Sequence, residues 1–300
     1  MTLGTPTRDA STPAIRDFDT MPHDLMTEFV ARYPAQPATA FWRGIEIEVL
    51  ARSDLPEGLG LDLGCGDGIL TDILFRRMGR KPDLVGIDPD PLETEAARTT
   101  GLYARVHTCF GNDIPEPDAT FDYVISNSVL EHIPDLEPVI REASRVLKPG
   151  GRFYFTVPSP EFRRNLRGSV WPGISRESYL ETLDRRLAHV SYLSRADWKN
   201  MCERNGLALD RSSGYLSPAQ TRRWETLSRM TGGLLHSLSM GRSRPIEIQR
   251  SMGLRQLQNR RALPRGAAAA LARAVVAGVG EEASGIASCL LVEGHRVQPS

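Results

Sequence analysis

Short apolar runs alternate with segments of helical periodicity between residues 59 and 157. The apolar runs have the length of buried strands, and the segments between them place apolar residues on one face at helical spacing. Lys148-Pro149-Gly150-Gly151 is expected to end the last helix and turn the chain into a strand. This alternation predicts βαβ units, and hence an α/β fold with a doubly wound, mostly parallel sheet. The strands expected here are Leu59–Leu63, Asp83–Ile87, Tyr103–Cys109, Phe121–Ser126 and Arg152–Val157.

The pattern before this core is less regular. Residues 1–22 are rich in Thr, Pro and charge, and we expect them to form a disordered leader. Residues 23–52 are expected to be partly helical, because Trp42, Ile45 and Val49 fall on one face. This segment is predicted to form an N-terminal lid helix.

The pattern after the core predicts one more helix and two more strands. The helix is expected at Ser194–Asn205, because its first Ser stands three residues before an Asp and a Gly follows its end. The strands are expected at Leu207–Leu216 and Ile286–Val292. Between them, residues 217–284 read as a mainly helical insertion. It holds eleven Arg, no Lys and four Glu, and therefore carries a net charge of +7.

The overall composition is that of an ordinary globular protein. Basic and acidic residues balance at 37 each over 300 residues, so no global field favours nucleic acid. The four cysteines are scattered, and neither a disulfide framework nor a metal site is predicted from their spacing. The chain shows no secretory signal pattern, and the apolar stretch 266–280 is interrupted by Arg273 and too short to cross a bilayer. We therefore expect a cytoplasmic location.

Three glycines alternate directly after the first predicted strand, in Leu61-Asp62-Leu63-Gly64-Cys65-Gly66-Asp67-Gly68. A glycine-rich turn between a strand and a helix lets backbone N–H groups approach a ligand closely. A dinucleotide fingerprint needs the third glycine one position later, where Ile69 stands, so NAD and FAD are disfavoured. Asp62 would repel a pyrophosphate and attract an ammonium group.

A second acid, Asp88, ends the next predicted strand. In doubly wound sheets an acid at this position accepts hydrogen bonds from ribose hydroxyls. As a simple helix cap before Pro89 it would need no ligand, but its pairing with the glycine loop favours the ribose role.

At this point the chain resembles the class I S-adenosylmethionine-dependent methyltransferases, and among them the group related to ubiquinone-biosynthesis enzymes. The resemblance covers residues 40–160 motif by motif and includes the glycine loop, Asp88, Phe121–Ile133 and Arg145–Gly151. It implies a seven-stranded sheet with an antiparallel last strand, residues 23–216 plus 285–296 as the methyltransferase domain, and S-adenosyl-L-methionine as cofactor. The positions that it implies for cofactor binding are Asp62, Gly64, Cys65, Gly66, Gly68, Asp88, Pro89, Asn112, Asp113, Ile114, Asn127 and Ser128, with Asp113 near the adenine amine and Ile114 against the ring.

Methyl transfer from a sulfonium needs alignment and exclusion of water, and no metal is required. A hydroxyl acceptor benefits from a base, and His132 is the candidate because it follows the fourth strand at the edge where ligands bind. The alternative is that His132 only shapes the wall beside the cofactor. His189, Tyr192 and Arg43 are candidate substrate contacts. The alternative for His189 and Tyr192 is hydrogen bonding within the fold, whereas a buried Arg43 needs an anionic partner.

The insertion bears on the acceptor. Its arginines suit phosphate or carboxylate, and Leu271, Val275, Val276 and Val279 form an apolar stripe, so the acceptor could be anionic or lipid-linked, with peripheral membrane contact. A helical cap or a dimer interface is the alternative, and the oligomeric state stays open. The arginines concerned are Arg222, Arg223, Arg229, Arg242, Arg244 and Arg250.

The favoured function is methyl transfer to a small-molecule hydroxyl by in-line displacement. N- or C-methylation and a non-catalytic binding protein are the alternatives, and the intact glycine loop argues against the latter. A nucleic-acid methyltransferase would favour an Asn/Asp-Pro-Pro-aromatic sequence, which Asn127-Ser128-Val129-Leu130 lacks.

Overall fold

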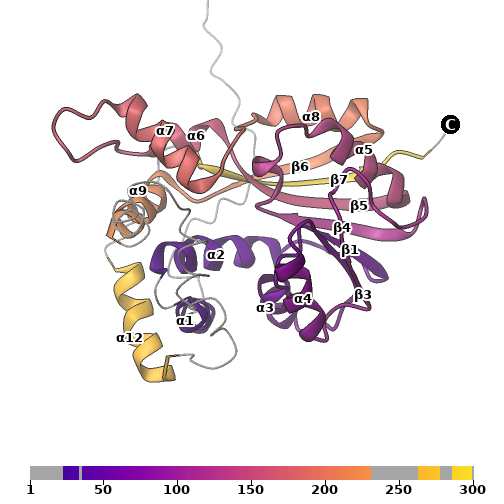
Figure 1. Ribbon diagram of the computed structural model, residues 1–300, viewed down its shortest axis with the longest axis horizontal. Helices are drawn as coiled ribbons and strands as arrows, with labels where there is room; N and C mark the ends of the chain where they lie inside the picture. Colours follow the sequence, from indigo (N-terminus) through magenta and orange to yellow (C-terminus); the bar gives the residue numbers. More distant parts are fainter. Residues whose placement is uncertain (1–22, 34–35, 231–262, 278–285, 299–300) are drawn as a thin grey trace, which may run out of the picture.

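A single seven-stranded sheet organises the protein. The computed structural model describes residues 23–33, 36–230, 263–277 and 286–298. The strand order is β3-β2-β1-β4-β5-β7-β6, with β7 antiparallel to both neighbours and the other pairs parallel (Figure 1). This is the doubly wound sheet that the sequence predicts. The strands are β1 Leu59–Leu63, β2 Asp83–Asp88, β3 Arg105–Thr108, β4 Phe121–Asn127, β5 Leu147–Pro158, β6 Leu207–Tyr215 and β7 Cys289–Arg296.

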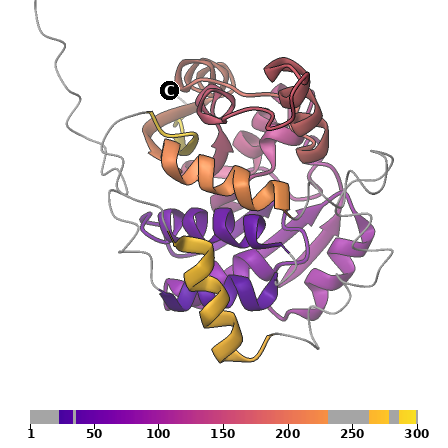
Figure 2. The same cartoon turned by 90° about the vertical axis from the view of Figure 1, so that its left-hand side faces the viewer.

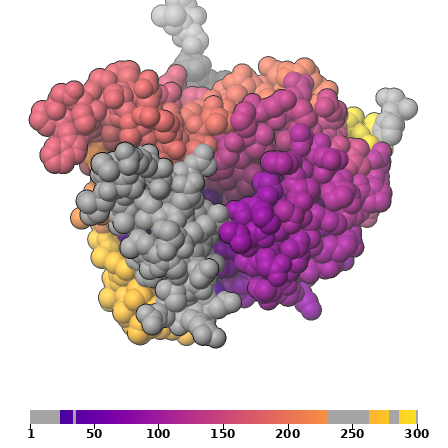
Figure 3. All heavy atoms as spheres, in the orientation of Figure 1, coloured from indigo at the N-terminus to yellow at the C-terminus, as the bar shows by residue number. Residues whose placement is uncertain are grey.

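Helices cover both faces of the sheet. In Figure 1, α3 and α4 lie on one face, and α5 and α8 on the other. The segment that contains α6 and α7 projects from the molecule at the upper left of Figure 3. None of the helices in the described ranges is long and apolar enough to cross a membrane. The helices are α1 His23–Arg32, α2 Pro37–Leu50, α3 Ile69–Arg77, α4 Pro91–Thr99, α5 Glu137–Val146, α6 Pro160–Asn165, α7 Arg176–Leu187, α8 Arg195–Arg204, α9 Pro218–Ser228 and α12 Arg265–Val276.

Two apolar cores flank the sheet because strand side chains alternate between its faces. Along β4, Tyr123 and Ile125 belong to the core that also contains side chains of α2 and α3, whereas Val124 belongs to the core with those of α5 and α8. All three are at most 1% exposed. Both faces of the central strands are therefore covered, as a parallel sheet requires.

The described part of the insertion packs against the N-terminal helices. Figure 2 shows α9 above α2, and α12 beside α1 and α2. The buried residues of α12 are Ala268, Ala272 and Val275, and Leu271 and Val276 are partly buried against the same core. Much of the apolar side of this helix is therefore packed within the chain, and contact with a membrane stays a prediction. Val279 lies outside the described residues.

Two arginines in the described part of the insertion bond to protein groups. Arg223 donates to the backbone carbonyl groups of Ala274 and Val275 at the end of α12. Arg229 pairs with Glu225 at 2.8 Å. Both guanidinium groups thus use some of their donors on protein acceptors, and their binding of an anion stays a prediction. Arg242, Arg244 and Arg250 lie outside the described residues.

Three strands differ from the sequence-based expectation by more than one residue at an end. The last strand begins at Cys289, not Ile286, and runs past Val292 to Arg296, because neighbours on both sides continue its ladder through polar residues. Glu293 within it is neutralised by Arg211 at 2.6 Å. The third strand begins later because Tyr103 turns toward the glycine loop, and the fifth begins earlier, at Leu147, directly after α5.

Candidate functional site

The glycine loop follows β1 at the carboxyl edge of the sheet. Gly64, Gly66 and Gly68 have φ angles of +83°, +53° and +78°. A Cβ on Gly64 would lie 2.4 Å from Val129, and one on Gly68 would lie 2.8 Å from Tyr103. On Gly66 the nearest atom would be 3.9 Å away, on Glu93. The outer glycines are thus required by packing, whereas the middle one faces open space that a ligand can enter.

The loop is fixed to the end of β2 by its own backbone. The N–H groups of Gly64 and Cys65 both donate to the carbonyl oxygen of Ile87 at 2.9 Å. Gly66 N–H donates to Asp88 Oδ2 at 3.0 Å, and Asp90 N–H donates to Asp88 Oδ1. A carboxylate has about four acceptor positions, so Asp88 can hold the loop and still accept from a ribose.

Asp62 lies beneath the loop and is 2% exposed. Its Oδ2 accepts hydrogen bonds from Thr71 Oγ1 and from the Tyr103 hydroxyl, each at 2.6 Å. Burial raises the pKa of Asp62 to about 6, and the two hydrogen bonds oppose that rise. Asp62 therefore supports the loop from within the protein, through two side chains that the sequence reasoning did not single out.

The segment after β3 divides into exposed and buried residues. Asn112 and Asp113 are exposed, whereas Ile114 is 3% exposed and packs in the core with side chains of α5. Ile114 N–H donates to Glu142 Oε2 at 3.1 Å. Ile114 thus anchors this segment, and its expected contact with an adenine ring stays a prediction.

The buried carboxylate of Glu46 accepts hydrogen bonds from residues in three parts of the chain. It accepts from Arg43 at 2.5 Å, from Ser128 Oγ at 2.5 Å and from the Tyr215 hydroxyl at 2.8 Å. With its amide nitrogen turned toward the carboxylate, Asn127 donates to both of its oxygens, at 3.1 and 3.2 Å. Ser128 and Asn127, expected at the cofactor, are thus held on α2.

Arg43 has the anionic partner that its burial requires. Its side chain is 26% exposed and bonds Glu46, and the pKa of the guanidinium is raised by Glu46 and Glu131 against the effect of burial. The structure thus gives Arg43 a role inside the protein, and its contact with a substrate stays a prediction. Sequence reasoning missed Glu46; the available signal was an acid four residues after Trp42 on the apolar face of a helix.

His132, the candidate base, lies at the exposed end of a 3₁₀ helix, Leu130–His132, that follows β4. Its Nδ1 is 2.9 Å from the carbonyl oxygen of Ala188. Because a carbonyl only accepts, Nδ1 carries the proton, and the lone pair of the neutral ring lies on Nε2. The backbone therefore holds His132 in the tautomer that a base requires.

The loop after α7 brings His189 beside His132, with ring centroids 5.3 Å apart. Burial is the largest cause that lowers the pKa of His189 to about 3, so its ring is neutral near pH 7. Tyr192 stacks on Phe162 and donates to Asp184 at 2.6 Å. His189 is thus adjacent to the candidate base, and Tyr192 lies against His189, with ring centroids 5.5 Å apart.

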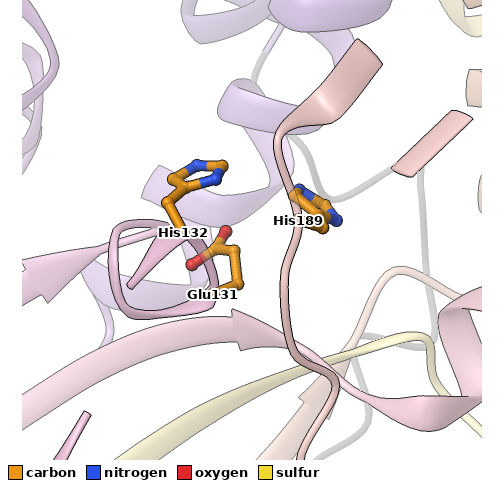
Figure 4. Close-up of side chains that lie close together, drawn as sticks. All are labelled: Glu131, His132 and His189. Atoms are coloured by element: carbon orange, nitrogen blue, oxygen red, sulfur yellow. The ribbon is translucent and has the colours of Figure 1, made fainter. Parts of the chain in front are cut away.

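Glu131, which the sequence reasoning passed over, lies between these groups and is 1% exposed. Burial raises the pKa of this carboxyl to about 8. The signal for it was present in the Glu131-His132-Ile133 stretch, but its proximity to His189 depends on the fold. Figure 4 shows Glu131, His132 and His189 together.

Comparison with known proteins agrees with the resemblance to methyltransferases that the sequence motifs indicated. Residues 40–212 match a family described as a methyltransferase domain. A ubiquinone biosynthesis O-methyltransferase of Hahella chejuensis is 28% identical over 190 residues, which cover 60% of this chain and 74% of that protein. A demethylmenaquinone methyltransferase of Bacillus licheniformis is 33% identical over 115 residues, covering 37% of this chain and 48% of that protein.

A solved structure shows that the fold is shared. The methyltransferase bound to its activator Trm112 from Haloferax volcanii superposes with a TM-score of 0.51 at 17% identity, covering 93% of this chain and 98% of that chain. The family match spans more than half of the chain, and there is open space over Gly66, whose N–H bonds Asp88. The chain belongs to the S-adenosylmethionine-dependent methyltransferases, with S-adenosyl-L-methionine as its methyl donor.

Proposed function

We propose that this methyltransferase transfers the methyl group to a hydroxyl oxygen of a small-molecule acceptor. The observation that carries the proposal is the hydrogen bond from His132 Nδ1 to the Ala188 carbonyl, since it leaves the Nε2 lone pair for the acceptor's proton. Hydroxyl acceptors gain most from such a group, because they must lose a proton when they are methylated. Transfer to nitrogen or carbon is the alternative.

The cofactor is proposed to lie over the middle of the glycine loop. Gly66 offers space for it, Asp88 is proposed to accept from its ribose, and Asp62 to attract its ammonium group through the loop. The remaining residues proposed for this site are Gly64, Cys65, Gly68, Pro89, Asn112, Asp113, Ile114, Asn127 and Ser128. When bound, S-adenosylmethionine supplies an activated methyl group to a nucleophile that attacks in line.

The protein's own part is to position the acceptor and to accept its proton. His132 Nε2 is proposed to take the hydroxyl proton as the oxygen attacks. His189 and Tyr192 are proposed to line the acceptor side, where their neutral, partly buried rings exclude water. The hydrogen bond from Ser128 to Glu46 joins the end of β4 to α2, and the pair of Arg43 with Glu46 keeps that carboxylate in place.

The names of relatives favour a small acceptor. The Hahella chejuensis relative is named an O-methyltransferase of ubiquinone biosynthesis. We propose a hydroxylated ring compound as the first acceptor to test. Arg223 and Arg229 satisfy protein acceptors, so an anionic acceptor gains no support from them.

A direct assay tests the proposal. The full chain is incubated with methyl-labelled S-adenosylmethionine and matched acceptors that carry a hydroxyl, an amine or only carbon nucleophiles on the same ring. Label on the hydroxyl acceptor, reduced in His132→Gln, supports the proposal. Label only on nitrogen or carbon overturns it.

A further inference from the structure

Three side chains from two distant segments meet beside the candidate acceptor position. Glu131 and His132 follow β4, and His189 follows α7; their metal-ligand atoms all lie within 4.8 Å of one another. Figure 4 shows the Glu131 carboxylate below the His132 ring, with His189 to the right of both. The backbone joins the segments, since Val190 N–H donates to the carbonyl oxygen of Glu131 at 2.9 Å. The cluster is therefore built into the fold.

Both imidazoles are oriented through Nδ1. His132 Nδ1–H donates to the carbonyl of Ala188, as described above. The single proton of the Tyr192 hydroxyl goes to Asp184 Oδ1 at 2.6 Å, so its oxygen accepts from His189 Nδ1 at 3.0 Å. In each neutral ring the lone pair then lies on Nε2. Histidines that bind metals show this arrangement, with the other ring nitrogen donating to a carbonyl or to a group linked to a carboxylate.

The third group is a buried oxygen that lacks a partner. Glu131 Oε2 has no hydrogen-bond partner among the described residues. Leaving a buried carboxylate oxygen unsatisfied is costly. The nearby charges do not compensate for it, because Arg43 bonds Glu46 and one guanidinium thus faces two buried carboxylates. A divalent cation at this point would displace the proton that the Glu131 carboxyl carries near pH 7 and would satisfy the oxygen.

We propose that Glu131, His132 and His189 bind a divalent transition-metal cation of the Zn²⁺ type. Two imidazoles and one carboxylate form a donor set that holds such metals in catalytic sites with open positions, whereas Mg²⁺ prefers oxygen ligands. Ligands about 2.1 Å from a tetrahedral metal lie roughly 3.4 Å apart. Metal binding would therefore draw the side chains closer by about 1 Å, which the exposed His132 allows.

The open positions of this metal would face the acceptor. This step rests on the proposed function: a hydroxyl placed there has a lowered pKa and a fixed orientation. In the metal-loaded protein His132 would be a ligand and not the base; the metal would lower the pKa of the acceptor hydroxyl, whose proton would pass to bulk water. The metal site thus refines how His132 acts and leaves the cofactor site unchanged.

Calorimetric titration of the chelator-treated full chain with Zn²⁺ tests the site without cofactor or acceptor. We expect one site per chain that discriminates against Mg²⁺ and is lost in Glu131→Gln and His189→Gln. Tyr192→Phe keeps the ring on Phe162 but removes the hydroxyl, and is expected to weaken Zn²⁺ binding about 10- to 100-fold. His295→Gln, at a surface pair with Asp210, is the matched control and should bind as the unmodified chain does.

Zn²⁺ binding that is absent, or equally tight in all variants, overturns the inference. Circular dichroism and S-adenosylmethionine affinity show that each variant is folded, so a lost site is not lost structure. The two proposals fail separately. Zn²⁺ bound at these residues without hydroxyl methylation overturns only the proposed function, and hydroxyl methylation with no Zn²⁺ site overturns only the metal.

Discussion

Ser128 donates a hydrogen bond to Glu46 at 2.5 Å, although the two residues lie 82 positions apart in the sequence. The bond joins the end of β4 to the N-terminal helix α2. The candidate base, His132, follows a few residues later in the chain. Arg43 and the Tyr215 hydroxyl share the same carboxylate. The end of the sheet and the helix that covers it therefore form one charged, hydrogen-bonded unit.

Glu46→Gln should be strongly destabilising. The substitution leaves Arg43 without its partner and weakens three hydrogen bonds to the carboxylate, at a cost of about 3 kcal/mol in the free energy of unfolding. Urea denaturation measures the loss. Glu95→Gln breaks the exposed pair with Arg98 and should cost no more than about 0.5 kcal/mol. Equal losses in both variants would contradict the central place given to Glu46.

Gly66→Ala should lower cofactor affinity by at least about tenfold, because a Cβ would enter the space that the ligand needs. The φ of +53° adds a strain of about 1–2 kcal/mol to the folded state. Gly79→Ala is the matched control, since Gly79 has a φ of +66° and open space but lies away from the loop. Calorimetry should show unchanged S-adenosylmethionine binding in that variant; equal loss in both would refute the proposed position of the cofactor.

Asp62 should make stability depend on pH. Its folded pKa of about 6 lies above the usual value of 3.8, so its contribution is greatest below about pH 4 and is lost as the pH rises through 6. The change is about 3 kcal/mol for a difference of about two pKa units. To isolate this contribution, the free energy of unfolding is measured from pH 4 to 7 for the unmodified chain and for Asp62→Asn, and the difference between the two is taken at each pH. A difference that stays constant across this range would contradict the assignment.

Tyr103→Phe offers a second test of Asp62. The Tyr103 hydroxyl donates to Asp62 Oδ2, and its hydrogen bond lowers the carboxyl's pKa. Removing the hydroxyl should shift the same pH-dependent loss of stability to higher pH. A shift to lower pH, or none, would show that the hydrogen bond does not stabilise the ionised carboxylate.

His132→Gln should reduce kcat for a hydroxyl acceptor by about 100-fold or more, because the group that promotes proton loss is removed. Cofactor affinity should remain unchanged, and turnover should recover partly at high pH, where the acceptor ionises by itself. His295→Gln serves as the control. Unchanged turnover of His132→Gln near pH 7 would leave His132 as part of the wall beside the cofactor.

The elements of the sheet were predictable because their signals are local. Five alternating strands, the glycine loop and the capping box at Ser194 depend on residues close in sequence, and the structure shows each of them. The final strand was misplaced because its second half is polar and is stabilised by partner strands. Local apolar pattern carries no information about such partners.

The charged part of the site was not predictable in the same way. Glu131 meets His189 only after α7 returns the chain to the sheet, and Glu46 meets Ser128 through the packing of α2. The spacing of these residues matches no local metal or catalytic motif. For Arg43, the sequence indicated that a buried guanidinium needs an anionic partner, but it did not indicate that this partner is Glu46.

The proposed reaction is tested most directly by the atom that receives the methyl group. Carbon-13 NMR of the product formed from ¹³C-methyl S-adenosylmethionine and a hydroxylated ring acceptor distinguishes methyl on oxygen, nitrogen and carbon. We predict label on oxygen, formed by the unmodified chain and strongly reduced in His132→Gln. Label on nitrogen or carbon alone, or equal labelling of oxygen by both proteins, would contradict the account.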